Sequence, residues 1–160
     1  MKKKIAILGS TGSIGKSLIN ILKKDKKNIE ICLLTAHKNY KELFKQIQTF
    51  NVKNIIITDP NSYLKVKKLL KKRKINILSS LDALNKIFIK KKIDYTMSAI
   101  SGFSGLKPTL DIIKYSKTNA IANKESIICG WSLIKKRLKK ITTICFICIL
   151  ENIKKTWTSL

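Results

Sequence analysis

The feature that most constrains the fold of this chain is a run of regularly spaced glycines, Gly9, Gly12 and Gly15, close to its first residue. A short apolar run precedes them at residues 4–8, and apolar residues at helical spacing follow them over residues 14–24. Glycine lets the backbone turn with positive φ and lets a ligand approach closely. The following helix directs its unpaired N–H groups and positive dipole end at such a turn. The pattern predicts a strand, a phosphate-binding turn and a helix.

The spacing is G-x-x-G-x-x-G rather than the commoner G-x-G-x-x-G, so a turn that only shapes the backbone remains an alternative. Ser10, Thr11 and Ser13 would add hydroxyl donors to a bound phosphate. The strand before the turn and the helix after it favour the interpretation as a dinucleotide-binding α/β domain.

Apolar and amphipathic runs alternate along the rest of the chain, which predicts βα repeats. The strand-like runs cover residues 4–8, 29–34, 54–57, 75–78, 93–97 and 118–122, and the helix-like runs cover residues 14–24, 40–50, 62–72, 81–88, 106–115 and 124–138. We expect a Rossmann-like, doubly wound α/β domain with a mainly parallel sheet and helices on both faces. Asn61 or Ser62 is expected to cap the third helix.

The end of the second strand bears on the choice of cofactor. An acidic residue there would bind the ribose 2′-hydroxyl of NAD, but this chain has His37, Lys38 and Asn39 instead. A cation and an amide suit a 2′-phosphate, so the sequence favours NADPH. The alternative is that Lys38 is one more surface lysine in a lysine-rich chain.

The formal net charge of +25 raises the possibility of nucleic-acid binding. Only Arg73 and Arg137 among the 34 basic residues are arginines, and the lysine runs are scattered rather than gathered on one element. Lysine, isoleucine and asparagine all have AT-rich codons, so base composition accounts for the charge. We therefore expect no nucleic-acid partner. No apolar run approaches a membrane span and the first strand begins at once, so a cytoplasmic protein without a membrane partner is expected.

The cysteines and the single histidine offer little chemistry. Cys145 and Cys148 have C-x-x-C spacing, but they lie in an apolar run without a second pair, which disfavours zinc or redox chemistry. All four cysteines, Cys32, Cys129, Cys145 and Cys148, should stay reduced in a cytoplasmic protein. His37 alone can form neither a catalytic triad nor a metal cluster.

Two later segments contain residues suited to a ligand site. Small residues over 98–105 leave a strand and enter a helix that has Pro108 in its first turn. Residues 122–126, Ala-Asn-Lys-Glu-Ser, follow the next strand and place an amide, a cation and an acid together. An ordinary exposed first helical turn is the alternative for Lys124 and Glu125.

In combination and in this order, the glycine turn, Lys38-Asn39, residues 99–109 and residues 122–126 resemble 1-deoxy-D-xylulose 5-phosphate reductoisomerase over residues 1–140. The resemblance implies an NADPH-dependent oxidoreductase and isomerase of the non-mevalonate route of isoprenoid biosynthesis, forming 2-C-methyl-D-erythritol 4-phosphate as a homodimer. It implies a sugar-phosphate substrate that Lys124 contacts. The cofactor-binding residues that it implies are Thr11, Gly12, Ser13, Ile14, Lys38, Asn39, Asn123 and Glu125. His37 stands where the family is expected to have glycine.

The family also uses Mg²⁺ or Mn²⁺ as a Lewis acid, held by carboxylates of an Asp-Ser-Glu-His motif that this sequence lacks. No catalytic residue and no metal ligand is therefore assigned. We expect an NADPH-binding domain at residues 1–140 and an aberrant tail at residues 141–160, produced by a frameshift or truncation that removed the catalytic and C-terminal domains. Such a chain would be inactive alone. The alternatives are a non-catalytic NADPH-binding remnant and a basic nucleic-acid-associated protein.

Overall fold

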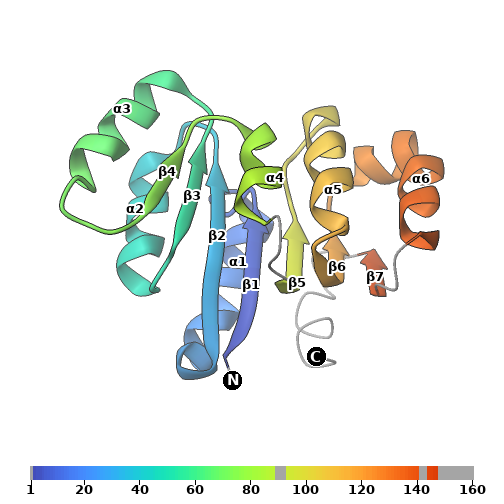
Figure 1. The fold of residues 1–160 in the computed structure, drawn as a ribbon, viewed down its shortest axis with the longest axis horizontal. Coiled ribbons are helices and arrows are strands. Elements are labelled where there is room, and N and C mark those ends of the chain that lie inside the picture. Colours follow the sequence, from blue (N-terminus) through green and yellow to red (C-terminus); the bar gives the residue numbers. More distant parts are fainter. Residues whose placement is uncertain (1, 89–92, 141–143, 148–160) are drawn as a thin grey trace.

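The computed structural model describes residues 2–88, 93–140 and 144–147, which form one α/β domain around a single parallel sheet (Figure 1). In these ranges the sheet has seven strands in the order β4-β3-β2-β1-β5-β6-β7. Their bounds are β1 (Lys3–Leu8), β2 (Ile29–Ala36), β3 (Asn54–Ile57), β4 (Asn76–Leu78), β5 (Ile93–Ser98), β6 (Ser116–Ile121) and β7 (Ile144–Ile147). The predicted Rossmann-like, doubly wound architecture is confirmed.

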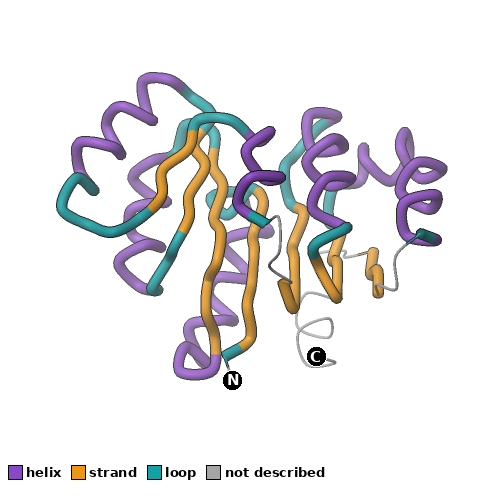
Figure 2. Tube along the Cα trace, viewed as in Figure 1, coloured by secondary structure: helices purple, strands orange, loops and turns teal. Residues whose placement is uncertain are grey.

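Helices connect the strands, and Figure 2 shows the two kinds of element alternating along the chain. The α-helices are α1 (Ser13–Leu22), α2 (Tyr40–Thr49), α3 (Pro60–Leu69), α4 (Leu84–Ile87), α5 (Leu106–Ile113) and α6 (Lys124–Lys139). The short 3-10 segments are η1 (Lys23–Asn28), η2 (Leu81–Ala83) and η3 (Phe103–Gly105). Each helix lies within a few residues of its predicted range.

The sheet grows outward from β1 in two directions, and this reversal places helices on both faces. The chain first builds β2, β3 and β4 on one side of β1, and then returns to build β5, β6 and β7 on the other side. Because parallel crossovers are right-handed, the reversal moves the connecting helices from one face to the other. The core clusters agree, since α1, α2 and α3 pack with Ile5 and Ile7, whereas α4 and α5 pack with Ala6 and Leu8.

β1 is the centre of the hydrophobic core because both of its faces are covered. Ile5, Ala6, Ile7 and Leu8 have no exposed surface at all. Burial of one large aliphatic side chain contributes about 1.5–3 kcal/mol. A strand that is buried on both faces reads as a continuous apolar run rather than an alternating one, as residues 5–8 do. The glycine turn therefore follows a strand that is fully buried on both faces.

Side chains cap three of the longer helices at their first turns. The side-chain oxygens of Asn39, Asp59 and Asn123 accept hydrogen bonds from the third residue beyond them, in α2, α3 and α6. The expectation that Asn61 or Ser62 caps α3 is wrong, because Pro60 already begins the helix. Proline fits the first helical position, where no intrahelical N–H is needed, so the cap moves back to Asp59.

β7 lies beyond residue 140, where the sequence placed the end of the domain. It pairs in parallel with β6, with Thr118 opposite Ile144 and Ile121 opposite Ile147. The remainder of the predicted tail, residues 141–143 and 148–160, lies outside the described residues. Among the helices that the structure describes, none combines the length and the apolar character needed to cross a membrane.

Candidate functional site

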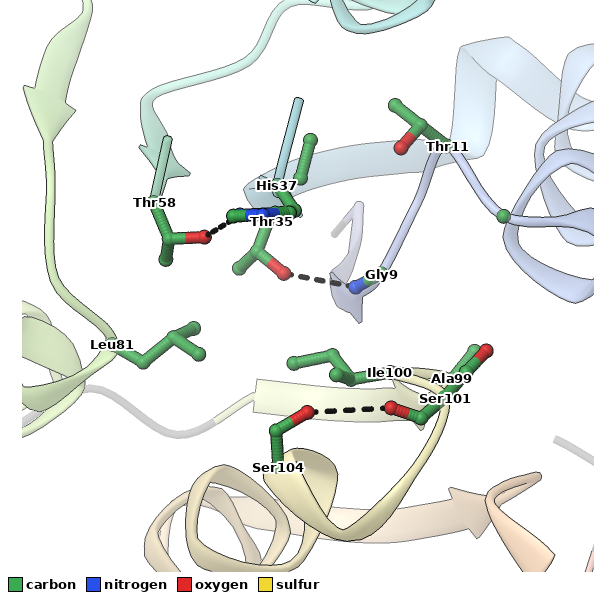
Figure 3. A pocket seen from close by; sticks show the side chains of 12 residues that line it. Gly9, Thr11, Thr35, His37, Thr58, Leu81, Ala99, Ile100, Ser101 and Ser104 are labelled. Carbon is green, nitrogen blue, oxygen red and sulfur yellow. Dashed lines mark hydrogen bonds between the residues drawn. The ribbon is translucent and has the colours of Figure 1, made fainter. Parts of the chain in front are cut away.

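A cavity of about 610 Å³ opens where the carboxyl ends of β1, β2 and β5 meet (Figure 3). This is the point at which the strand order reverses, and doubly wound sheets bind ligands at this position. The lining residues come from the end of β2 and from the segments that follow β1 to β5, and they are Gly9, Thr11, Gly12, Thr35, Ala36, His37, Thr58, Leu81, Ala99, Ile100, Ser101 and Ser104.

The three glycines of the first turn have different structural roles. Gly9 has φ +79°, and a Cβ there would lie 2.6 Å from the Ala99 carbonyl oxygen. A Cβ on Gly15 would lie 2.4 Å from the Gly9 carbonyl oxygen, because α1 packs directly on the turn. A Cβ on Gly12 would meet only the Gly9 oxygen, at an ordinary 3.5 Å. Folding therefore requires Gly9 and Gly15, whereas Gly12 leaves room at the cavity wall.

Thr35, at the end of β2, holds the turn in place. Its hydroxyl accepts a hydrogen bond from the Gly9 N–H at 2.8 Å (Figure 3), and its carbonyl accepts one from the Ser10 N–H at 2.9 Å. Both Thr35 and Ser10 are buried, at 2% and 0% exposure. Hydrogen bonds between buried groups are costly to lose, so the turn keeps one conformation.

The first turn of α1 presents an uncompensated positive dipole to the cavity. Its N-cap residue, Gly12, provides no side-chain hydrogen bond, and its first turn contains no acidic residue. The described helices α2, α3 and α6 differ, because each has a side-chain cap. Unpaired N–H groups at a helix start favour an anion, above all phosphate.

The residues after β2 form another wall of the cavity. His37 Nδ1 lies 2.9 Å from the Thr58 hydroxyl oxygen, and the ring lies against the cavity (Figure 3). Lys38 is exposed, and Asn39 is occupied in part as the cap of α2. Hydrogen bonding from Ser62, with the positive charge of Lys38 nearby, lowers the pKa of Asp59 below its usual value. The Asp59 carboxylate therefore stays charged near Lys38.

The loop after β5 forms the opposite wall, and Asn123 fixes its shape. The Asn123 amide donates hydrogen bonds to the carbonyls of Ile100 and Gly102, while its oxygen accepts from the Ser126 N–H at 2.7 Å. Its exposure is 3%. A Cβ on Gly105 would lie 2.3 Å from the Asn123 amide nitrogen, which explains a glycine at that position.

The structure gathers only some of the predicted site residues at the cavity. Thr11 and Gly12 line it, Ser13 and Ile14 form the adjoining first turn of α1, and Lys38 and Asn39 follow its His37 edge. Asn123 supports the loop after β5 through hydrogen bonds but does not itself line the cavity. Lys124 and Glu125 are exposed on the first turn of α6 and do not line the cavity either.

Thr58 and Leu81 line the cavity although nothing in the sequence marked them, since only the packing of β3 and η2 brings them there. The described residues contain no group of three or more His, Cys, Asp or Glu side chains able to hold a metal ion.

A family model described as 1-deoxy-D-xylulose 5-phosphate reductoisomerase matches residues 5–130. The reductoisomerase of Pelagibacter ubique is 66% identical over 142 residues, which are 88% of this chain and 37% of that protein. The reductoisomerase of Thermotoga maritima is 37% identical over 139 residues, covering 87% of this chain and 35% of that protein. The chain thus spans little more than a third of the length of these relatives.

Solved structures agree with the sequence comparisons. The reductoisomerase from Zymomonas mobilis in complex with NADPH superposes with a TM-score of 0.84 at 32% identity, covering 91% of this chain and 38% of that one. Homoserine dehydrogenase from S. aureus reaches a TM-score of 0.52 at 16% identity, a likeness of fold alone. The match over residues 5–130 covers most of the sequence, and with it the glycine turn and the loop of Asn123. The chain belongs to the 1-deoxy-D-xylulose 5-phosphate reductoisomerase family.

Proposed function

We propose that the chain binds NADPH in the cavity at the end of β1 and forms the cofactor-binding part of a 1-deoxy-D-xylulose 5-phosphate reductoisomerase. The observation that carries the proposal is the space at Gly12, beside a helix start with no cap and no acid. A dinucleotide pyrophosphate needs such an opening, because it must approach the backbone closely and accept hydrogen bonds from N–H groups. The Zymomonas mobilis relative, solved with NADPH, has the same fold.

The predicted residues of the first two loops then divide between two groups of the cofactor, its pyrophosphate and its 2′-phosphate. Thr11, Gly12, Ser13 and Ile14 would hold the pyrophosphate at the start of α1. Lys38 and Asn39 would face the 2′-phosphate, for which Lys38 supplies positive charge and the Asn39 amide supplies a donor. His37 would flank the adenosine where the family was expected to have glycine. Its contact with Thr58 supports this position, since it holds the ring at the cavity edge.

The remaining predicted residues follow β6. Asn123 would act by shaping the loop after β5, because its amide already has three hydrogen-bond partners. Glu125 would approach the cofactor and Lys124 the sugar-phosphate substrate from the exposed first turn of α6. These two assignments rest on the family, since neither side chain lines the cavity in this structure.

The reaction proposed for the whole enzyme converts 1-deoxy-D-xylulose 5-phosphate to 2-C-methyl-D-erythritol 4-phosphate for isoprenoid biosynthesis. NADPH supplies the hydride for its reductive step. The family's Mg²⁺ or Mn²⁺ finds no fitting donor set among the described residues, so no metal-assisted step is assigned to them. We expect the chain alone to bind NADPH and to show no turnover. Turnover by the pure chain with Mn²⁺ would contradict this expectation.

Titration with NADPH and NADH tests the proposal. NADPH should bind saturably and more tightly than NADH, and Lys38→Glu should weaken NADPH about tenfold to a hundredfold, the value of one charge-assisted hydrogen bond. Lys45→Glu makes the same change on an exposed residue of α2 and should leave the affinity unchanged. Equal affinity for both cofactors would refute the assignment of Lys38. Sedimentation of the pure chain would test whether it forms the family's homodimer.

A further inference from the structure

Gln46 is a buried amide in the middle of the apolar face of α2. It is 2% exposed and lies between Leu43 and Ile47, which are equally buried. Within the described ranges its side-chain oxygen has no hydrogen-bond partner. A buried polar group without a partner is destabilising, so an apolar residue would suit the packing of α2 better. The packing of α2 therefore does not explain why an amide is buried at this position.

A contact with the glycine turn, 36 residues earlier in the sequence, explains it. The Gln46 amide nitrogen donates a buried hydrogen bond to the Ser10 carbonyl oxygen at 2.9 Å. The same nitrogen lies 3.3 Å from a carboxylate oxygen of Glu42, which also accepts. Because both neighbours are acceptors, the nitrogen rather than the oxygen of the amide must face the turn.

Holding the Ser10 carbonyl also sets the direction of the next N–H group. The peptide bond between Ser10 and Thr11 is trans, since the described residues contain no cis peptide. In a planar trans peptide the carbonyl and the N–H point in opposite directions. With the Ser10 oxygen directed at buried Gln46, the Thr11 N–H is directed away from that side chain, and Thr11 itself lines the cavity.

We infer that Gln46 is a positioning residue that aims the Thr11 N–H at the 5′-phosphate of the bound dinucleotide. The inference rests on the proposed function, because it concerns the same cofactor site. Gln46 itself touches no cofactor, as it is buried behind the turn. Thr35 holds the first half of the turn through Gly9 and Ser10, and Gln46 holds the second half through the Ser10 carbonyl.

Two small ligands distinguish this role from general support of the fold. Adenosine 2′,5′-bisphosphate carries a phosphate for the turn, whereas adenosine 2′-monophosphate does not. Gln46→Met keeps the volume of the side chain and removes its donor. We expect about a tenfold to hundredfold loss of affinity for the bisphosphate and for NADPH, the value of one charge-assisted hydrogen bond. The affinity for the monophosphate, measured by displacement of NADPH, should not change.

Gln48→Met is the matched control, because Gln48 is an exposed glutamine on the same helix. It should leave all three affinities at their wild-type values. An equal loss for both small ligands in Gln46→Met would overturn the inference in favour of a purely structural role, and so would no loss at all. If the wild-type chain itself fails to bind NADPH, the proposed function fails rather than the role of Gln46 alone.

A second measurement needs no variant and covers the case in which Gln46→Met does not fold. In the wild-type chain, the amide proton of Thr11 should move downfield in a proton–nitrogen correlation spectrum when the bisphosphate is added. The monophosphate should leave it in place. A Thr11 resonance that is indifferent to the bisphosphate, with the ligand bound, would overturn the inference.

Discussion

The same substitution at two glycines of one turn should have different effects on stability. Gly9→Ala places a methyl group on a residue with φ +79°, which costs about 1–2 kcal/mol. The methyl carbon would also start 2.6 Å from the Ala99 carbonyl oxygen, and such overpacking against backbone costs a further 1–3 kcal/mol or so. The sum is about 2–5 kcal/mol, or roughly 4–20 °C in melting temperature for a chain of this size.

Gly12→Ala should not destabilise the fold. Gly12 has φ −74° and ψ 173°, a conformation open to any residue, and its new methyl would meet only one atom at 3.5 Å. Alanine at a compatible position usually stabilises by about 0.4–1 kcal/mol, because it restricts the unfolded chain. NADPH binding should nevertheless fall sharply, since the methyl occupies the space proposed for the pyrophosphate.

Thermal unfolding followed by circular dichroism, with cofactor titration of each variant, measures both effects. The reasoning predicts a lower melting temperature for Gly9→Ala and an unchanged or higher one for Gly12→Ala. It would be refuted if Gly12→Ala were as destabilising as Gly9→Ala, or if Gly12→Ala bound NADPH like the wild type.

The remaining predictions concern ionisation and reactivity. Hydrogen bonds from Ser62 lower the pKa of Asp59, so the carboxylate that caps α3 stabilises the fold above its ordinary pKa of 3.8, and this contribution is lost as the pH falls through the lowered pKa. Asp59→Asn keeps an accepting cap and should flatten that part of the acid unfolding curve; an unaltered curve would contradict the role of Asp59. Burial raises the pKa of Cys32 to about 12, so a thiol reagent at pH 8 should label exposed Cys129 and spare Cys32 until the protein unfolds, as peptide mapping would show. Asn123→Asp removes the amide that donates to Ile100 and Gly102, so the loop after β5 should exchange its amide hydrogens faster than in the wild type.

The fold could be predicted from the sequence because its signals are local. The apolar run before Gly9 and the alternation of strand-like and helix-like segments determine a parallel sheet with crossover helices. Element boundaries were predicted less accurately, as the cap of α3 shows: Asn61 and Ser62 are good capping residues, but Pro60 fits the first helical position better and moves the cap to Asp59. The strand β7 was not predicted, because its place in the sheet depends on pairing with distant β6.

The candidate site was predictable where one segment contains both the turn and the helix that would bind the ligand, as at Thr11 and Gly12. It was not predictable where the wall comes from packing between distant elements. Thr58 and Leu81 are unremarkable in the sequence and reach the cavity only through β3 and η2. Gln46 interrupts an apolar helix face, and only its hydrogen bond to Ser10 explains why an amide is placed there.

Amide chemical-shift mapping during a titration with NADPH tests the central claim most directly. The cavity at the end of β1 predicts that the largest changes fall on residues 11–14, 35–39 and 99–104, with little change at the lysine-rich segment η1. Changes that gather on η1 and other lysine-rich surfaces, or a spectrum that does not respond, would contradict it.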